Sequence, residues 1–381
     1  MLGLLFVGSG TAFAASGHAH PGSGSMRLPL VQDAGAWATG HVQGIAVDVE
    51  GGYVYYSFTN MLAKYDFQGE LLATLVGWRG HLGDIAFNPA DGRIYGSLEY
   101  KRDHAFYIAI VDGDALDRVG LDNERSSIMR GVHLAEVAGD YTADMDGDGK
   151  FDGDTANTPD HRYGTSGIDG VAFGPAFGQT SGKHLLTIGY GIYSNVDRLD
   201  NDHQVLLQYD VSGWDGYARA LDEDALHRSG PAQVDGKYFL RTGNTRYGVQ
   251  NLAYDAGMAR WFLGVYAGLK AGFPNYTLFS VSAARKPEMG DLVGVASSNG
   301  SGWEGGMLLQ LADDGLEDPV TGVRGWHQKA DVGFHPVGDG LFYIAENLGG
   351  HGWQAARITL NRWTGEPETP FAPLDRGNSP P

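Results

Sequence analysis

The sequence contains no cysteine, which excludes disulfide bonds and thiol chemistry. Basic residues are scarce, because 27 Lys and Arg stand against 46 Asp and Glu and the net charge is −19. An acidic surface repels phosphates, so non-specific binding to nucleic acid or to anionic membranes is excluded. No apolar run after the N-terminal segment approaches the ~20 residues of a membrane helix. Because the net charge is so negative, any acidic ligand needs a local basic pocket.

The N-terminus has the pattern of an export signal. An apolar run ends at Ala12, Phe13 and Ala14, and a stretch of Gly, Ser and His follows. Such a run with small residues at its end is typical of a secretory signal and its cleavage site, although the usual basic residues before it are missing. We predict a signal peptide and leader at 1–25 and a secreted or periplasmic mature protein.

One short strand pattern recurs along the chain. It has a polar or aromatic start, then small residues, then an alternating apolar strand. The copies are HVQGIAVD at 41–48, HLGDIAFN at 81–88, SGIDGVAFG at 166–174, YGVQNLAYD at 247–255 and, more loosely, KADVGFHP at 329–336. Tight turns and further strands follow several copies, and 59 glycines and 19 tyrosines suit many short strands joined by turns.

Short strands in units of about 40 residues, without a long segment of helical period, predict an all-β protein with a β-propeller fold. Five blades are recognisable, and the stretches 211–246 and 286–326 cannot be divided clearly into the strands of a blade. We expect six to eight blades, with seven preferred; a pair of β-sandwiches is the alternative. We assign 26–366 to a single propeller domain with an insertion at about 140–160, and 367–381 to a tail.

In a propeller, the starts of the first strands and the ends of the second strands converge on one funnel, where sites usually lie. The first strands offer His41, His81, Ser166, Arg246, Tyr247 and His327. The second strands add Tyr56, Glu99, Tyr100, Lys101, Tyr190, Tyr193, Tyr266, Glu346 and Asn347. A single His or Tyr at such a place is more often structural, but matching residues in several blades favour a shared site.

The insertion contains an aspartate-rich loop, ADMDGDGKFDGD at 143–154. Four carboxylates stand at positions 1, 3, 5 and 9 of an EF-hand-type loop: Asp144, Asp146, Asp148 and Asp152. Gly149 is at position 6, where the chain turns, but Thr155 replaces the usual Glu at position 12. We predict a calcium site with a structural role; a solvated acidic loop is the alternative.

Three runs carry a family resemblance: GHLGDIAFNPADGRIYGSLEYK, HRYGTSGIDGVAFGPAFG and GYGIYSNVDRLDNDHQVLLQYD. With HVQGIAVD before them, they resemble the secreted seven-bladed propeller polysaccharide lyases that cut at uronic acids, which include ulvan lyases and rhamnosyl-glucuronate lyases. The resemblance covers roughly residues 40–360 and rests on the blade pattern and the order of polar residues. It implies cleavage of an acidic polysaccharide by β-elimination.

The resemblance also implies the site. Elimination needs a base for the C5 proton, an acid for the departing O4 and a cation beside the carboxylate. The implied catalytic residues are His81, His104, Tyr190 and Arg198, and the implied substrate contacts are His41, Lys101, Arg246 and Tyr247. The family has a second His where this chain offers Lys101 or His104, and spacing does not decide between them. Tyr193 is likewise an alternative to Tyr190.

Two other function classes compete with the lyase. A hydrolase on the same scaffold needs paired carboxylates, for which Glu99 and Glu346 are available. A non-catalytic carbohydrate-binding propeller would use Tyr and Trp to stack on sugars. In each case the partner is a polysaccharide, and we expect a monomer because a closed propeller has few exposed strand edges.

Overall fold

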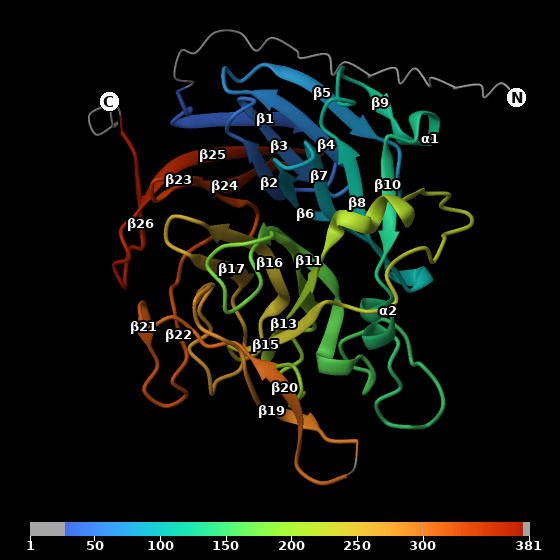
Figure 1. Cartoon of the computed structure of the whole chain (residues 1–381), viewed down its shortest axis with the longest axis vertical. Helices are drawn as coiled ribbons and strands as arrows, with labels where there is room; N and C mark the ends of the chain where they lie inside the picture. The colour runs from blue at the N-terminus through green and yellow to red at the C-terminus, as the bar shows by residue number, and fades with distance from the viewer. Residues whose placement is uncertain (1–26, 299, 376–381) are drawn as a thin grey trace, which may run out of the picture.

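The structure, a computed structural model, describes residues 27–298 and 300–375. The predicted export signal at 1–25 lies outside the described residues. Five sheets are arranged around a centre, with their first strands packed side by side in a ring (Figure 1). The all-β propeller fold is therefore confirmed. None of the helices in the described ranges has the length and apolar character needed to cross a membrane.

Each blade begins with a channel-lining strand, and the blades are numbered here in chain order. Blade 1 contains β2 (Val42–Asp48), β3 (Tyr53–Phe58), β4 (Met61–Asp66), β5 (Leu71–Val76) and β9 (Leu121–Asp122). Blade 2 contains β6 (His81–Asn88), β7 (Arg93–Tyr100), β8 (Ala105–Asp112), β10 (Met129–His133) and β14 (Arg219–Ala220).

The next two blades differ in width. Blade 3 contains β11 (Thr165–Gly174), β12 (Leu185–Ile192), β13 (His203–Tyr209), β15 (Gly236–Arg241), β20 (Trp303–Leu308) and β19 (Glu288–Ala296). Blade 4 contains β16 (Arg246–Asp255), β17 (Arg260–Tyr266) and β18 (Leu278–Ser282). A separate pair is formed by β21 (Leu316–Glu317) and β22 (Arg324–Gly325).

Blade 5 closes the ring with both ends of the described chain. It contains β23 (Phe334–Gly338), β24 (Leu341–Gly350), β25 (Trp353–Trp363), β26 (Phe371–Pro373) and the N-terminal β1 (Val31–Trp37). Short helices connect the strands: α1 (Asn123–Ser126), α2 (Ala135–Tyr141), η1 (Lys101–Asp103), η2 (Arg162–Gly164) and η3 (Val211–Gly216). Because β1 pairs with β25, terminal strands far apart in sequence complete one sheet.

The structure has five blades, so the preferred count of seven is wrong. The two stretches without the repeat pattern contain strands that widen existing blades, together with the separate pair β21 and β22, and none of these strands begins a new blade. In 211–246, β14 joins the outer edge of blade 2 and β15 that of blade 3. In 286–326, β20 pairs in parallel with β15 and carries β19 with it. Neither stretch contains a copy of the channel-lining pattern, and the five copies in the sequence correspond to the five blades.

A buried carboxylate joins three blades at the centre of the ring. Asp84 is 2% exposed and accepts backbone N–H groups from Ile85 at 2.9 Å, Val171 at 3.0 Å and Leu252 at 3.1 Å. Burial raises the pKa of Asp84 well above its ordinary value, although these three donors oppose the shift. A Cβ on Gly44 of blade 1 would lie 2.4 Å from Asp84 Oδ1. The small residues in the repeat thus allow the first strands to approach one another.

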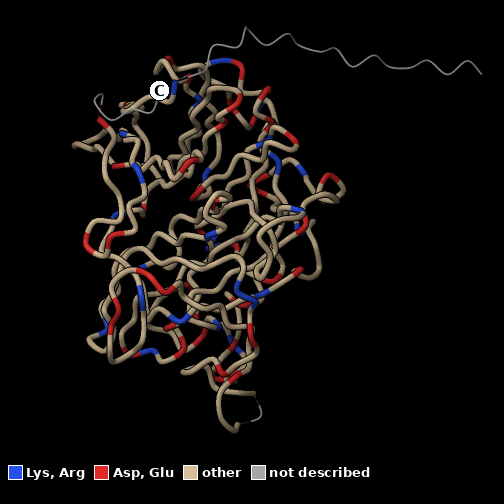
Figure 2. The backbone as a smooth tube through the Cα atoms, turned by 60° about the vertical axis from the view of Figure 1, so that its left-hand side comes forward, with Lys and Arg blue, Asp and Glu red and all other residues tan. Residues whose placement is uncertain are grey.

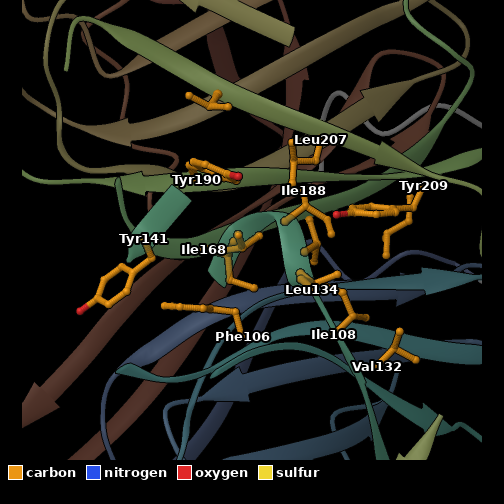
Figure 3. Close-up of a cluster of buried hydrophobic side chains, with 14 of the residues drawn as sticks. Phe106, Ile108, Val132, Leu134, Tyr141, Ile168, Ile188, Tyr190, Leu207 and Tyr209 are labelled. Carbon is orange, nitrogen blue, oxygen red and sulfur yellow. The ribbon is translucent and has the colours of Figure 1, made fainter. Parts of the chain in front are cut away.

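The core consists of side chains packed between neighbouring blades. Figure 3 shows one such cluster, in which Phe106 and Ile108 from blade 2 face Ile168 and Ile188 from blade 3. Fully burying a side chain of this size contributes about 1.5–3 kcal/mol to stability. Charged positions are spread along the chain outside such clusters, with Asp and Glu interspersed with Lys and Arg (Figure 2).

Candidate functional site

A cavity of about 1070 Å³ lies at the starts of the first strands. Five residues expected there from the sequence line it: His41, His81, Lys101, Arg246 and Tyr247. The funnel residues Glu99, Tyr100, Ser166 and Tyr266 line it as well. Tyr56, His327, Glu346 and Asn347 are not among the lining residues. The volume is at the upper end of the range for small-molecule sites.

Connecting segments add charges that the sequence did not place in the cavity. The lining contains four basic residues, Arg79, Lys101, Arg102 and Arg246, and six acidic ones, Glu99, Asp103, Asp154, Asp169, Glu223 and Asp224. Arg79 is committed to Glu223 and Asp224, at 3.0 Å and 2.9 Å. Among the described residues, Arg102 and Arg246 have no ion pair. The cavity is therefore mixed in charge, with two guanidinium groups available to an anionic ligand.

His81 begins β6 and has the properties of a neutral base. Its side chain is 36% exposed, and its buried Nδ1 has no hydrogen-bond partner. Burial lowers the pKa of His81; Glu99 opposes this shift, while Lys101 and His41 add to it. An imidazole with a lowered pKa is uncharged at neutral pH and can accept a proton.

Glu99 and Lys101 form an ion pair beside His81. Glu99 is 4% exposed, and its Oε2 lies 3.3 Å from Lys101 Nζ and 3.9 Å from His81 Nδ1. Burial by itself lowers the pKa of Lys101, but Glu99, Asp169 and Tyr193 outweigh it, so this pKa is raised. Lys101 therefore carries a positive charge at the cavity wall.

Asp169 on β11 is the carboxyl group of the cavity that interacts with Glu99. Burial, followed by the charge of Glu99, raises the pKa of Asp169 well above its ordinary value, while Lys101 and a hydrogen bond from Gln250 oppose the shift. Gln250 Nε2 donates to Asp169 Oδ2 at 3.0 Å and to the Tyr247 carbonyl at 2.8 Å. This amide thus connects the carboxyl group to the backbone of the next blade.

Tyr247 presents an aromatic ring to the cavity from a constrained backbone. It is 53% exposed and has φ of +67°, a left-handed conformation that is unfavourable for a bulky residue. Its ring centroid lies 6.0 Å from that of Tyr266 in an edge-to-face contact. Such backbone outliers cluster at ligand sites, and an exposed ring beside Arg246 can contact a sugar and its carboxylate together.

His41 lies at the start of β2 with its tautomer set by the backbone. Its Nδ1 is 2.7 Å from the Val42 carbonyl, so the proton is assigned to Nδ1 and donated to that oxygen. Nε2 then accepts, at 3.4 Å, from Gln43 Nε2. His41 is consequently held as a polar contact on the cavity wall.

Two residues expected to be catalytic are buried away from the cavity. Tyr190 is fully buried in the cluster of Figure 3, and its hydroxyl donates to Asp140 Oδ2 at 2.7 Å. The Arg198 side chain is 8% exposed and pairs with Asp200 at 2.8 Å. Its guanidinium also donates to the carbonyl oxygens of Thr158, Asp160 and His161. Both side chains hold the insertion in place.

His104 and Tyr193, the remaining candidates, also contact the insertion. His104 packs its ring against Phe151 at a centroid distance of 4.9 Å. Tyr193 is half-buried and packs against His161 at 5.0 Å. Neither is among the cavity-lining residues, whereas Asp154 from the insertion is. The geometry therefore favours Lys101 over His104 and keeps Tyr190 out of the cavity, whereas Tyr193 lies behind the lining, where its hydroxyl interacts electrostatically with Lys101 and Glu99.

The aspartate loop forms a compact acidic group. Carboxylate oxygens of Asp144, Asp146 and Asp148 lie within 4.8 Å of one another, and Asp152 is not part of this group. Asp144 accepts the N–H groups of Gly147 and Gly149 at 2.7 Å and 2.8 Å. Gly149 has φ of +83°, as the turn at position 6 requires. These three exposed carboxylates are the residues of the loop that could hold a metal ion.

Sequence reasoning missed Asp169 and Gln250 although a signal was present. Asp84, Asp169 and Gln250 occupy the same fourth position in three copies of the repeat. A polar residue at one position of several channel-lining strands indicates a common location near the axis. Asp154, Glu223 and Asp224 come from irregular segments, and no periodic pattern marks them.

Comparison with known proteins adds three distant propeller-like structures. No family model matches the chain, and no curated protein matches it. Sqt1 of Saccharomyces cerevisiae is 11% identical over 84% of this chain and 59% of its own, with a TM-score of 0.32; this chain thus spans less than two thirds of Sqt1. The Dos1 propeller is 10% identical over 87% of this chain and 68% of its own, with a TM-score of 0.34.

The third similar structure is the PQQ domain of pyranose dehydrogenase from Coprinopsis cinerea. It is 10% identical over 83% of this chain and 81% of its own, with a TM-score of 0.39. The propeller assignment for this chain comes from its own strand pairing.

Proposed function

We propose that the protein is a polysaccharide lyase that cleaves a uronic-acid-containing polysaccharide of the ulvan or rhamnosyl-glucuronate type by β-elimination. The observation that supports it most directly is that one cavity brings together the imidazole of His81 and the amine of Lys101, which lie 3.9 Å and 3.3 Å from the same Glu99 oxygen. A base and a cation in one place are what removal of a proton next to a carboxylate requires. The N-terminal pattern supports a secreted enzyme, and the closed fold supports a monomer.

In this mechanism the cations meet the uronate carboxylate first. Arg246 and Lys101 neutralise it, which lowers the cost of the enolate-like charge that develops when the C5 proton leaves. His81 accepts that proton. The electron pair of the C5–H bond forms the C4–C5 double bond, the C4–O4 bond breaks, and O4 takes a proton.

Tyr247 takes the acid role in place of Tyr190. Its exposed ring contacts the sugar, and its hydroxyl supplies the proton to the departing O4. Asp169 opposes the binding of an anion least when it is protonated, and the raised pKa of this carboxyl supports that state. His41, at the start of the neighbouring blade 1, adds a further sugar contact on the side of His81 that faces away from Tyr247 in the ring of blades.

Calcium has a structural place in the proposal. Asp144, Asp146 and Asp148 would hold the ion, with Asp152 reaching it by local adjustment of the loop. The ion would neutralise carboxylates that otherwise repel one another and would stiffen the insertion, whose Asp154 lines the cavity. It takes no part in proton transfer.

The test is ultraviolet absorbance of the unsaturated product, measured on uronate polysaccharides including ulvan and gum arabic. We expect product from the native protein and a loss of at least about a hundredfold in kcat for His81→Asn, within the usual range for removing a general base. His104→Asn is the matched control, because His104 is outside the cavity, and it should retain activity. Absence of unsaturated product from folded protein on every polysaccharide would refute the lyase.

A glycoside hydrolase is the second candidate, and one observation favours it. Glu99 and Asp169 are two interacting carboxyl groups in the cavity, and the raised pKa of Asp169 suits a general acid. In that case new reducing ends would form without ultraviolet absorbance. Asp169→Asn would then abolish activity, whereas His81→Asn would leave most of it.

A further inference from the structure

The side chain of Glu99 contacts groups on its own blade and on the neighbouring blade. It stands opposite His81 in the register of β6 and β7, at the end of blade 2. Its Oε1 crosses to blade 3, where it accepts the N–H of Ile168 at 2.6 Å. Its Oε2 faces Lys101 at 3.3 Å and His81 at 3.9 Å.

Blade 3 is shaped to admit this carboxylate. Gly167 has φ of +123°, and a Cβ built on it would lie 1.8 Å from Glu99 Oε1. No side chain fits there without moving Glu99. The backbone of β11 therefore provides both the donor and the space that fix one oxygen, which leaves the other directed at Lys101 and His81.

We infer that Glu99 is a positioning residue, which holds the Lys101 ammonium and the His81 imidazole in the arrangement that proton abstraction requires. This role rests on the proposed lyase function. Glu99 transfers no proton itself: its charge anchors Lys101 beside the substrate carboxylate and balances the effect of Lys101 on the imidazole.

The charges around His81 predict the direction of the effect. The interacting groups are Glu99 on β7, Lys101 on η1 and His41 before β2, and Arg79 lines the same cavity. Burial, Lys101 and His41 lower the pKa of His81, and Glu99 alone opposes them. Replacing Glu99 by a neutral residue should therefore lower this pKa further.

The first experiment needs no substrate. The His81 imidazole is titrated by NMR in the native protein, in Glu99→Gln and in the control Glu304→Gln, which removes a carboxylate that binds Arg162 and Tyr163. Gln keeps an oxygen acceptor for the Ile168 N–H. We expect a lower His81 pKa in Glu99→Gln and the native pKa in Glu304→Gln. An unchanged His81 pKa in folded Glu99→Gln would overturn the inference.

The second experiment measures the pH profile of kcat/KM on the cleaved polysaccharide. Glu99→Gln should move the acidic limb to lower pH and reduce kcat/KM at least tenfold, because Lys101 loses its anchor. Gly167→Ala displaces the same carboxylate, so the double variant Glu99→Gln, Gly167→Ala should have nearly the same kcat/KM as Glu99→Gln alone. If either variant does not fold, Glu99→Asp provides the test, with the same shift to a smaller extent.

The outcomes separate the inference from the proposed function. Absence of unsaturated product refutes the lyase, while the NMR titration still tests the coupling of Glu99 to His81. Loss of activity in Glu99→Gln at every pH, with the native protein forming reducing ends but no unsaturated product, would assign Glu99 to direct catalysis in a hydrolase and overturn the positioning role.

Discussion

Tyr190 donates its hydroxyl hydrogen bond to Asp140 across 2.7 Å, inside a cluster from which water is excluded. This contact joins the second strand of blade 3 to α2, the helix that leads into the aspartate loop. A tyrosine in this setting is part of the scaffold, and burial and the Asp140 charge raise the pKa of its phenol well above the ordinary value. That phenol does not exchange protons near neutral pH.

The first prediction concerns Tyr190→Phe. Removing this donor leaves the buried Asp140 carboxylate with Lys237 as a remaining hydrogen-bond partner. We therefore expect a loss of about 1–3 kcal/mol in the free energy of unfolding. Urea denaturation measures this loss. Tyr247→Phe, at an exposed position, should unfold like the native protein but lose lyase activity. Full stability of Tyr190→Phe together with loss of activity would return Tyr190 to the catalytic site.

The second prediction concerns Asp84. Asp84→Leu leaves the N–H groups of Val171 and Leu252 without their acceptor in a dry environment, at about 1–3 kcal/mol for each group. Asp84→Asn keeps one oxygen acceptor and should be the less damaging change. Urea midpoints of the two variants check the order, and equal midpoints would contradict the role of Asp84 in joining the blades.

The third prediction concerns acid. Burial, as the largest cause, lowers the pKa of His133 and of His203 to about 4, against an ordinary value of 6.5. Between these values the unfolded chain binds protons at these two positions that the folded protein does not, so their contribution to stability is complete above pH 6.5 and falls as the pH drops toward 4. The raised pKa values of Asp84 and Asp169 act in the opposite direction, so the histidine contribution is measured as a difference between the native protein and a variant that lacks one of these histidines.

A variant isolates this effect. His203 is 1% exposed, and His203→Gln removes one of the titrating groups, while His133 and His335, whose pKa burial likewise lowers to about 4, remain. The free energy of unfolding should then depend less steeply on pH between 4 and 6.5, even if the variant is less stable overall. His351→Gln, at an exposed histidine, serves as the control and should keep the native slope.

The fourth prediction concerns the aspartate loop. If calcium binds there, titration calorimetry should detect one site, and chelation should lower the melting temperature because the ion binds only the folded loop. Asp144→Asn should abolish the heat, since Asp144 also organises the turn through Gly147 and Gly149. Asp117→Asn, at an exposed acid elsewhere, should leave it unchanged. Equal heats from both variants would exclude this loop as the site.

The alternation of a strand explains why one part of the site was predicted and another was not. His41, His81 and Tyr247 mark strand starts, which any propeller directs to its funnel, so their place followed from the repeat. Tyr190 lies within a strand, where a shift of one residue moves a side chain to the opposite face. Whether the Tyr190 side chain points to the cavity or to the core depended on the pairing of β11 with β12, which includes register shifts.

By itself, the sequence determined the all-β class, the five channel-lining strands and most of the basic and aromatic residues at their starts, because these depend on a local pattern with period two. Tertiary structure decided the number of blades, since only strand pairing shows that a strand without the repeat pattern, such as β15, extends the outer edge of an existing sheet. It also decided the charge of the cavity: Glu223 and Asp154 reach it from irregular segments, and burial sets the protonation of His81 and Asp169.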